Sequence, residues 1–134
     1  MAALTIAADE ISGFHESLCR DWTNVDGTLV EPDMILFLPE EFPWQPMTYR
    51  GVAALSSFRE ALDVMSEGTF ESVTEGITAD ESVVAIRCRE RAARHHSQLE
   101  WSSLWIYVLA GGRIREARVL HALPSDDITD FWCV

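Results

Sequence analysis

The spacing between hydrophobic residues changes along the chain, from helical spacing in the first half to strand spacing in the second. Residues 7–22 carry apolar side chains three or four positions apart, which predicts an amphipathic helix. Val52–Met65 shows the same spacing and predicts a second helix, which Gly68 ends. The apolar positions of the first helix are Ile11, Phe14, Leu18 and Trp22.

Alternating apolar and polar residues predict strands in the second half of the chain. Gly111-Gly112 is typical of the tight turn in a hairpin. Between the two helices, the apolar run Met34–Leu38 predicts a brief strand, and the proline-rich residues 39–48 predict a loop. The four later strands are expected at Phe70–Thr78, Val83–Ala92, Leu99–Leu109 and Ile114–Leu120.

The order of these elements predicts the fold class. Helices first and antiparallel strands last indicate an α+β domain with helices packed on one face of a curved sheet. Short helical turns are expected before Val30 and after Pro124. No linker, repeat or low-complexity tract divides residues 1–134, so we expect a single domain.

The charge of the chain argues against two classes of partner. Ten Lys and Arg against 22 Asp and Glu give a net charge of −12, and so acidic a surface repels nucleic-acid phosphates and anionic membranes. The three scattered cysteines predict neither a disulfide framework nor a zinc site. The sequence shows no signal peptide and no apolar run long enough to cross a bilayer, so we expect a cytoplasmic protein.

The strand expected at Val83–Ala92 has one apolar face and one strongly basic face. If the apolar face forms the core, which the periodicity favours, the arginines lie in water. If the basic face lines a cavity, the arginines form a reactive or anion-binding pocket, because buried charges persist only when paired or used. The apolar face carries Val84, Ile86 and Cys88, and the basic face carries Arg87, Arg89 and Arg91.

Two segments of the chain resemble a known superfamily. Tyr49-Arg50-Gly51 precedes the second helix, and residues 104–114 read as a strand, a glycine turn and the start of another strand. Together with the order of elements, they resemble the nuclear transport factor 2-like superfamily, closest in style to SnoaL-like polyketide cyclases and ketosteroid isomerases. The resemblance implies a cone-shaped antiparallel sheet, helices over its concave face around a mostly apolar pocket, and a convex face that commonly binds a second subunit.

The register of the ketosteroid isomerases can be laid on residues 83–121 without a gap, and it implies which side chains face the pocket. The residues that this register turns inward are Arg87, Arg89, Arg91, Glu100, Ser102, Leu104, Ile106, Ala117, Val119 and His121. Those that it turns to the convex side, where we expect a homodimer interface, are Val84, Ile86, Cys88, Trp101, Trp105 and Tyr107.

The chain also departs from the superfamily's known active sites. The isomerase general-base Asp falls on Leu38, its oxyanion-stabilising Asp on Leu104 and its Tyr donor on Leu18. The last-strand Asp of the limonene epoxide hydrolases falls near Val119. Neither set of catalytic groups is therefore intact, and the polar residues left in the implied pocket are Arg87, Arg89, Glu100 and His121.

Each of these four residues has a structural and a functional interpretation. Glu100 is either a strand-start carboxylate partly in water or a general acid or base paired with Arg89. His121 is either a hydrogen-bonded core residue or a group that transfers a proton near neutral pH. Arg87 and Arg89 are either surface residues or the groups that stabilise an oxyanion of the substrate.

The rest of the implied pocket is largely apolar. Adjacent His95 and His96 point to opposite sides of a strand and read as an exposed hairpin, so no metal site is expected. His15 lies on the flank of the first helix, from which it is able to reach the cavity. The residues expected to line the pocket are Phe14, Leu18, Trp22, Leu36, Leu38, Trp44, Tyr49, Phe58, Ser102, Leu104 and Val119.

Together with the resemblance, these observations predict a small cyclase, isomerase or dehydratase that acts without a cofactor on an apolar, oxygenated metabolite of polyketide or terpenoid type. Glu100 and His121 would exchange the proton, while Arg89 and Arg87 hold the oxyanion. Two alternatives remain open: an epoxide-opening enzyme of the same fold, and a non-catalytic dimeric domain that binds a ligand.

Overall fold

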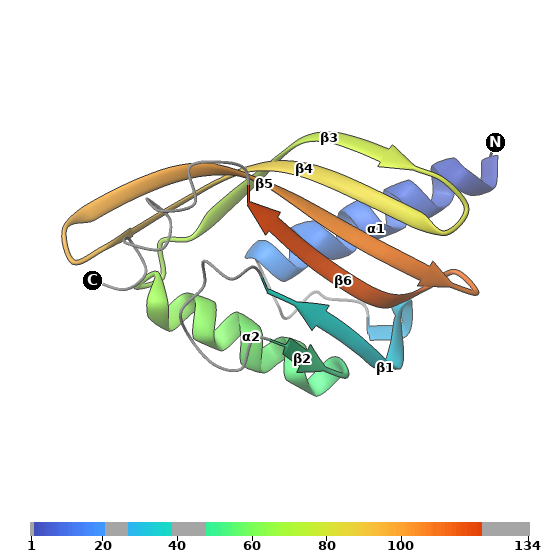
Figure 1. The fold of residues 1–134 in the computed structure, drawn as a ribbon, viewed down its shortest axis with the longest axis horizontal. Helices are drawn as coiled ribbons and strands as arrows, with labels where there is room; N and C mark the ends of the chain where they lie inside the picture. Colours follow the sequence, from blue (N-terminus) through green and yellow to red (C-terminus); the bar gives the residue numbers. More distant parts are fainter. Residues whose placement is uncertain (1, 21–26, 39–47, 122–134) are drawn as a thin grey trace.

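Two long helices and a six-stranded sheet make up the fold (Figure 1). The computed structural model describes residues 2–20, 27–38 and 48–121. The elements, in chain order, are α1 (Ala2–Arg20), the 3-10 turn η2 (Gly27–Leu29), β1 (Val30–Phe37), β2 (Thr48–Arg50), α2 (Val52–Met65), β3 (Glu71–Ala79), β4 (Val83–Arg94), β5 (Ser97–Ala110) and β6 (Arg113–His121).

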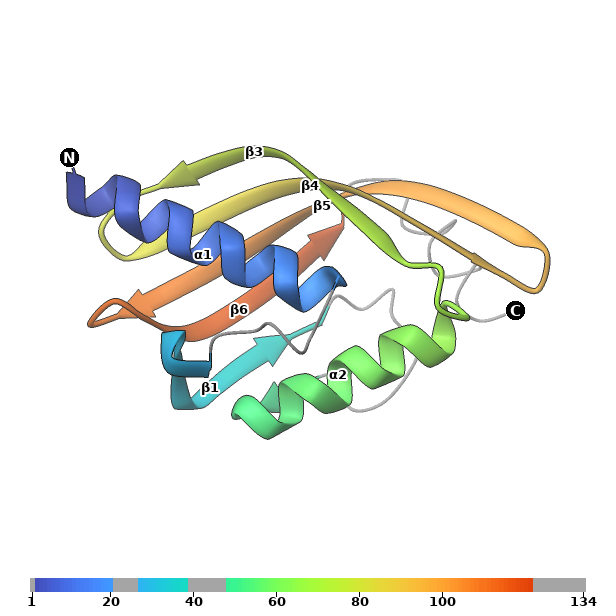
Figure 2. The same ribbon diagram turned by 180° about the vertical axis from the view of Figure 1, so that it is seen from behind.

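The strands form one sheet in the order β2-β1-β6-β5-β4-β3. β1 pairs in parallel with β6, and the other neighbouring strands are antiparallel. The pairing is irregular between Thr74 and Gly76 in β3 and between Val108 and Leu109 in β5, and such bulges bend and twist a strand. The result is the curled sheet seen from opposite sides in Figures 1 and 2.

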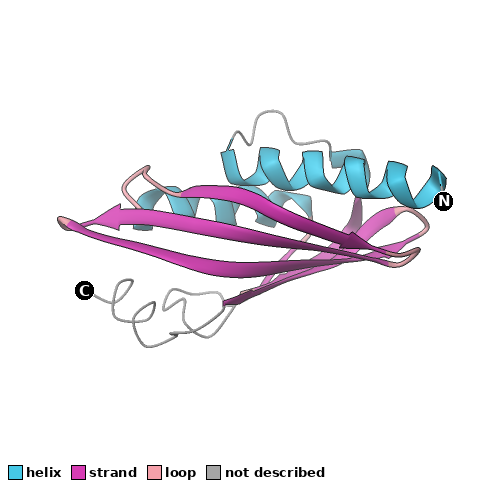
Figure 3. Cartoon of the chain, turned by 90° about the horizontal axis from the view of Figure 1, so that it is seen from above, coloured by secondary structure: helices cyan, strands magenta, loops and turns pink. Residues whose placement is uncertain are grey.

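Both helices pack on the same face of this sheet (Figure 3). We call the face under the helices the inner face and the opposite one the outer face. Phe14 of α1 meets Tyr107 of β5 with ring centroids 6.1 Å apart, and Phe58 of α2 meets Trp105 at 6.3 Å. Aromatic edges from both helices therefore close over the middle of the longest strand.

The hydrophobic core lies between the helices and the inner face. Its strand residues alternate with exposed or half-exposed neighbours, as expected when one face of an antiparallel sheet is covered. On β4 the buried side chains are those of Val84, Ile86, Cys88 and Glu90; on β5 they are Trp101, Ser103, Trp105, Tyr107 and Leu109; on β6 they are Ile114, Ala117 and Val119.

Both predicted helices and all the predicted strands are present, in an α+β fold as expected. The second helix has the predicted bounds, while α1 begins at Ala2 instead of residue 7. Gly111 and Gly112 form the predicted hairpin turn with φ angles of 59° and 80°, which favour glycine. The turn at residues 27–29 also agrees with the predicted one before Val30.

The orientation implied by the isomerase register is wrong for β4 and β5. Arg87, Arg89 and Arg91 lie on the outer face, whereas Ile86 and Cys88 are fully buried beneath the helices. Successive strand residues point to opposite faces, so a register that is one residue off reverses every side chain of the strand. The residues wrongly expected inside on β5 are Glu100, Ser102, Leu104 and Ile106, and those wrongly expected on the convex side are Trp101, Trp105 and Tyr107.

The same register is correct for β6. Ala117 and Val119 are buried on the inner face, and both ring nitrogens of His121 are buried. Trp22, Trp44, the expected loop over residues 39–47 and the turn after Pro124 lie outside the described residues. Among the helices that the structure describes, none is both long and apolar enough to span a membrane.

Candidate active site in the helix-covered interior

A carboxylate is buried on the inner face of β4. Glu90 continues the alternation that places Ile86 and Cys88 inside, and only 1% of the residue is exposed. Trp101 donates a hydrogen bond from Nε1 to Glu90 Oε1 at 3.1 Å, and Trp105 donates one to Oε2 at 2.9 Å. Each carboxylate oxygen thus has its own indole donor from the neighbouring strand β5.

Burial makes Glu90 a weaker acid than an exposed glutamate. Desolvation raises its pKa above the ordinary value of 4.5, because the charged form is poorly stabilised away from water. Ser103, Ser72 and the two indoles lower the pKa and offset part of this effect. A carboxyl group held in this way is suited to exchange a proton near neutral pH.

A histidine from α1 lies beside this carboxylate region. The Nδ1 atom of His15 is 2.7 Å from the hydroxyl of Tyr107, and its Nε2 atom is 3.2 Å from the Sγ atom of Cys88. Its ring also meets the ring of Trp105, with centroids 4.9 Å apart. A neutral imidazole has one donor and one acceptor nitrogen, so it is able to satisfy the hydroxyl and the thiol together.

The groups around His15 are uncharged at neutral pH. Burial lowers the pKa of His15 to about 4, raises that of Cys88 to about 12 and raises that of Tyr107 well above its ordinary value. Cys19 lies 3.8 Å from His15 Nε2, and burial also raises the pKa of its thiol. Together these side chains form a low-dielectric polar cluster with Glu90 as its only acidic group among the described residues.

His121 closes the other side of the cluster. It ends β6 on the inner face, and its ring lies 5.9 Å from that of Trp101, centroid to centroid. Burial lowers its pKa to about 4. The predicted inward position of His121 is therefore confirmed, and its predicted part in proton transfer stays a prediction.

A cavity of about 430 Å³ leads to this cluster between α1, α2 and β3. Ser72 lies opposite Glu90 in the β3–β4 register, so the inner wall of the cavity adjoins the carboxylate. Its lining residues are Cys19, Arg59, Gly68, Phe70, Glu71, Ser72 and Val73.

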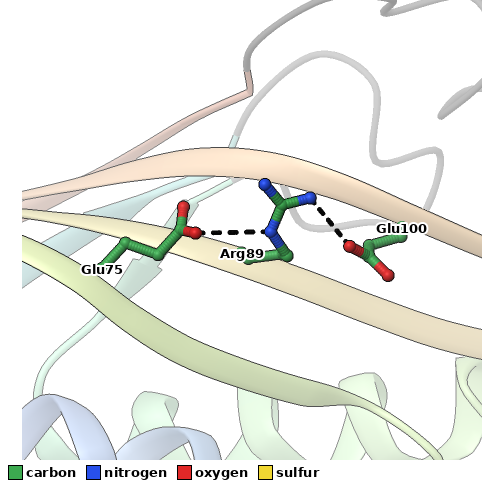
Figure 4. A network of polar contacts seen from close by, with 3 residues as sticks. All are labelled: Glu75, Arg89 and Glu100. Atoms are coloured by element: carbon green, nitrogen blue, oxygen red, sulfur yellow. Dashed lines mark hydrogen bonds and ion pairs between the residues drawn. The ribbon is translucent and has the colours of Figure 1, made fainter.

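The predicted pair of Arg89 and Glu100 does form, but on the outer face (Figure 4). Arg89 Nη1 donates to Glu100 Oε1 at 2.8 Å, and its Nε donates to Glu75 Oε2 at 3.3 Å. About half of each side chain of Arg89 and Glu100 is exposed. The ion pair is confirmed and its predicted place in the helix-covered pocket is wrong, so the catalytic roles given to both residues have lost their geometric basis.

Arg87 lies on the same outer face, against the backbone of β3. A Cβ atom added to Gly76 would be 3.0 Å from Arg87 Nη2, so a side chain there would displace this guanidinium group. Glu100 and Arg91 help to line a second cavity of about 550 Å³ near the β4–β5 hairpin. The other residues that line it are Thr69, Glu71, Ala92, Ala93, Gln98 and Leu99.

Most of the residues expected to line an apolar pocket do lie inside. Ser102 and Leu104 are the exceptions, because both are half-exposed on the outer face. The expected residues that are buried within the described part are Phe14, Leu18, Leu36, Leu38, Tyr49, Phe58 and Val119. Their contact with a ligand stays a prediction.

The sequence interpretation missed the central residues of the cluster. Glu90 was hidden because the inverted register assigned its face to a subunit contact, although a carboxylate at the end of an apolar face is itself an unusual signal. His15 is buried, and not merely on a helix flank. Tyr107, Cys88 and Ser72 carried no separate sequence signal. Within the described ranges, no group of His, Cys, Asp or Glu is arranged to hold a metal ion.

Comparisons with known proteins bear on the fold. No protein-family model matches the sequence, and no curated protein does. Among solved structures, Bal32a from a soil-derived mobile gene cassette shares 14% identity and a TM-score of 0.84, over 97% of this chain and 98% of that one. A proposed SnoaL-like polyketide cyclase from Jannaschia sp. CCS1 shares 15% sequence identity with a TM-score of 0.70, over 90% of this chain and 88% of that one. An NTF2-like protein from Anabaena variabilis shares 12% sequence identity with a TM-score of 0.71, over 92% of both chains.

Proposed function

We propose that this chain, which has the fold of the nuclear transport factor 2-like superfamily, is a cyclase or isomerase that moves a proton on a small, apolar, oxygenated metabolite. The fold is shared with a proposed SnoaL-like polyketide cyclase, and a shared fold alone does not establish a reaction. The observation that carries the proposal is the buried carboxyl group of Glu90, which lies opposite Ser72 of the cavity wall in the β3–β4 register.

Glu90 is the proposed general acid or base. Its raised pKa brings the neutral and charged forms closer in free energy near neutral pH, as proton exchange with a carbon or oxygen of the substrate requires. The hydroxyl of Tyr107, which lies 2.7 Å from His15 Nδ1, is the neutral donor that we propose stabilises a developing oxyanion. His121 remains a second proposed proton carrier, and no cofactor is required for these steps.

Exchange of substrate protons in D₂O tests this proposal. The protein is incubated with a panel of cyclic enones and polyketide-like β-diketones, and deuterium uptake and product formation are followed by mass spectrometry. Glu90→Gln should lower the rate by about 100-fold or more, while Glu100→Gln on the outer face should keep it within about twofold. The reverse result would place the reaction at the outer cavity and overturn the proposal.

A ligand-binding domain without catalysis is the second candidate. It is favoured by the completeness of the Glu90 contacts, since both carboxylate oxygens already accept a hydrogen bond and the residue is almost fully buried. Saturable binding of a panel compound with no deuterium uptake or product would support this candidate over the enzyme.

We also propose that two copies associate through the outer face. Leu120 is 49% exposed and lies opposite Leu104 in the β5–β6 register, and Val73 of β3, opposite Arg89 of β4, is 54% exposed. Charged side chains on this face pair with one another within the chain, as Arg89 does with Glu100 and Arg118 with Glu116. The aromatic stripe first expected at this interface is instead part of the core.

A further inference from the structure

We infer that Arg59 selects a ligand that carries an anionic oxygen, such as a carboxylate or an enolate, on an otherwise apolar body. The inference deepens the proposed function and rests on it, because it concerns the cavity between α1, α2 and β3, whose wall residue Ser72 lies opposite Glu90. It names the chemical class of the ligand and the residue that recognises it.

Of the two terminal nitrogens of the Arg59 guanidinium group, one has a partner in the described residues and the other has none. Its Nη2 atom forms an ion pair with Asp63 Oδ1 at 3.1 Å, one helical turn away, and the side chain of Asp63 is 48% exposed. Its Nη1 atom is buried and has no hydrogen-bond partner among the described residues. Buried polar groups are almost always hydrogen-bonded, so an arginine N–H without a partner calls for a specific explanation.

The position of Arg59 connects this unused donor to the cavity. The side chain is 13% exposed and belongs to the cavity wall, together with Cys19 and Ser72. Burial raises the pKa of the Cys19 thiol, and the positive charge of Arg59 offsets part of that rise. The Ser72 hydroxyl lies on the same wall, so the cavity presents a second polar group beside Arg59.

The remaining charges near the cavity do not compete for this donor. Glu71 also lines the cavity, but its carboxylate is held by Arg91, with Nη2 at 2.6 Å and Nε at 2.8 Å from Oε2. Phe70 supplies an apolar surface. A planar anion with an apolar body satisfies both the guanidinium and this surface, whereas a cation would face Arg59 unfavourably.

The test compares two probes of nearly equal shape, 2-naphthoate and its neutral amide 2-naphthamide, by titration calorimetry at pH 7.5. The wild type should bind the naphthoate at least about tenfold more tightly than the amide. Arg59→Met should abolish this preference while still binding the amide. Arg113→Met, which removes an exposed arginine from β6, is the matched control for the change in net charge and should keep the preference.

A second variant separates recognition from a structural role. Asp63→Asn removes the partner of Nη2 and should strengthen naphthoate binding, because the whole guanidinium becomes available. If Arg59 serves only the helix, both variants lower the melting temperature and the preference for the anion stays unchanged, which overturns the inference. It is also overturned if the wild type binds both probes equally, or neither at millimolar concentration.

These outcomes are distinct from a failure of the proposed reaction. Anion-selective binding through Arg59, without any proton exchange, would support the inference and refute the enzyme. Proton exchange at Glu90 on neutral compounds, with no effect of Arg59→Met on the preference between the probes, would support the enzyme and refute the inference about Arg59.

Discussion

Trp105 donates a 2.9 Å hydrogen bond from its indole nitrogen to the buried carboxylate of Glu90, one strand away. Trp101 does the same for the other oxygen. Two aromatic residues thus bury a charged group and satisfy it at once, which makes Glu90 a structural centre of the sheet as well as the proposed reactive group. Stability and activity at this position are therefore expected to be separable only by careful choice of variant.

Replacing Glu90 by glutamine should destabilise the fold. Glutamine keeps the shape but has one oxygen, so its NH₂ group must face one of the two indole donors. Leaving one buried donor unsatisfied costs about 1–3 kcal/mol, which denaturant unfolding would detect. Glu100→Gln removes a half-exposed ion pair and should cost less than about 1 kcal/mol.

The cost of Glu90→Gln should also depend on pH. The pKa of Glu90 is raised in the folded state, so its contribution to stability is full below pH 4.5 and is lost as pH rises through the folded pKa. The difference in unfolding free energy between wild type and Glu90→Gln should therefore be larger at pH 5 than at pH 7.5. An equal difference at both values would contradict the raised pKa.

The buried histidines should make the protein sensitive to mild acid. His15 has a pKa of about 4 in the folded state against an ordinary value of 6.5, so the unfolded state takes up its proton first as pH falls. Stability is then full above pH 6.5 and falls towards pH 4, by on the order of 3 kcal/mol for this residue. The lowered pKa of His121 also makes the fold less stable as pH falls. The raised pKa of Glu90 has the opposite effect and offsets part of this loss.

Denaturant unfolding between pH 7.5 and 4.5 measures this loss. His15→Phe should flatten the curve, because the variant no longer takes up that proton on unfolding. His96→Gln is the matched control, since His96 is exposed in the hairpin and folding does not bury its imidazole. An unchanged slope in His15→Phe would show that His15 is not the group responsible.

The contact between His15 and Tyr107 should fasten α1 to the sheet. Tyr107→Phe removes a hydroxyl 2.7 Å from His15 Nδ1 and should cost about 1–3 kcal/mol, because a buried polar atom loses its partner. A double-mutant cycle with His15→Phe should give a coupling energy of at least about 0.5 kcal/mol. Additive effects would mean that the two side chains act independently.

The proposed association through the outer face predicts a charge-sensitive dimer. Leu120→Glu places a carboxylate in the exposed apolar part of this face and should shift the protein towards monomer, as measured by light scattering after size exclusion. Val64→Glu is the matched control, because Val64 is 70% exposed on α2 and lies away from the sheet's outer face. Wild-type protein that is monomeric at high concentration would refute the dimer.

The strand β4 shows which structural features the sequence pattern predicts correctly. The alternation of Ile86, Arg87, Cys88 and Arg89 identifies the strand and separates an apolar from a charged face. The simplest interpretation, with the apolar face in the core, agrees with the structure. The family register reversed it, and the error moved Glu90 out of the predicted site.

The sequence by itself determined both helices, five of the six strands, the hairpin turns and the α+β class, because these follow from local spacing and turn chemistry. The short strand β2 was not predicted. It also separated the two faces of each strand. Tertiary structure alone decided which face the helices cover, since a one-residue shift reverses both faces at no cost to the local pattern. That decision placed Arg89 and Glu100 in water and brought Glu90, His15 and Tyr107 together from elements far apart in the chain.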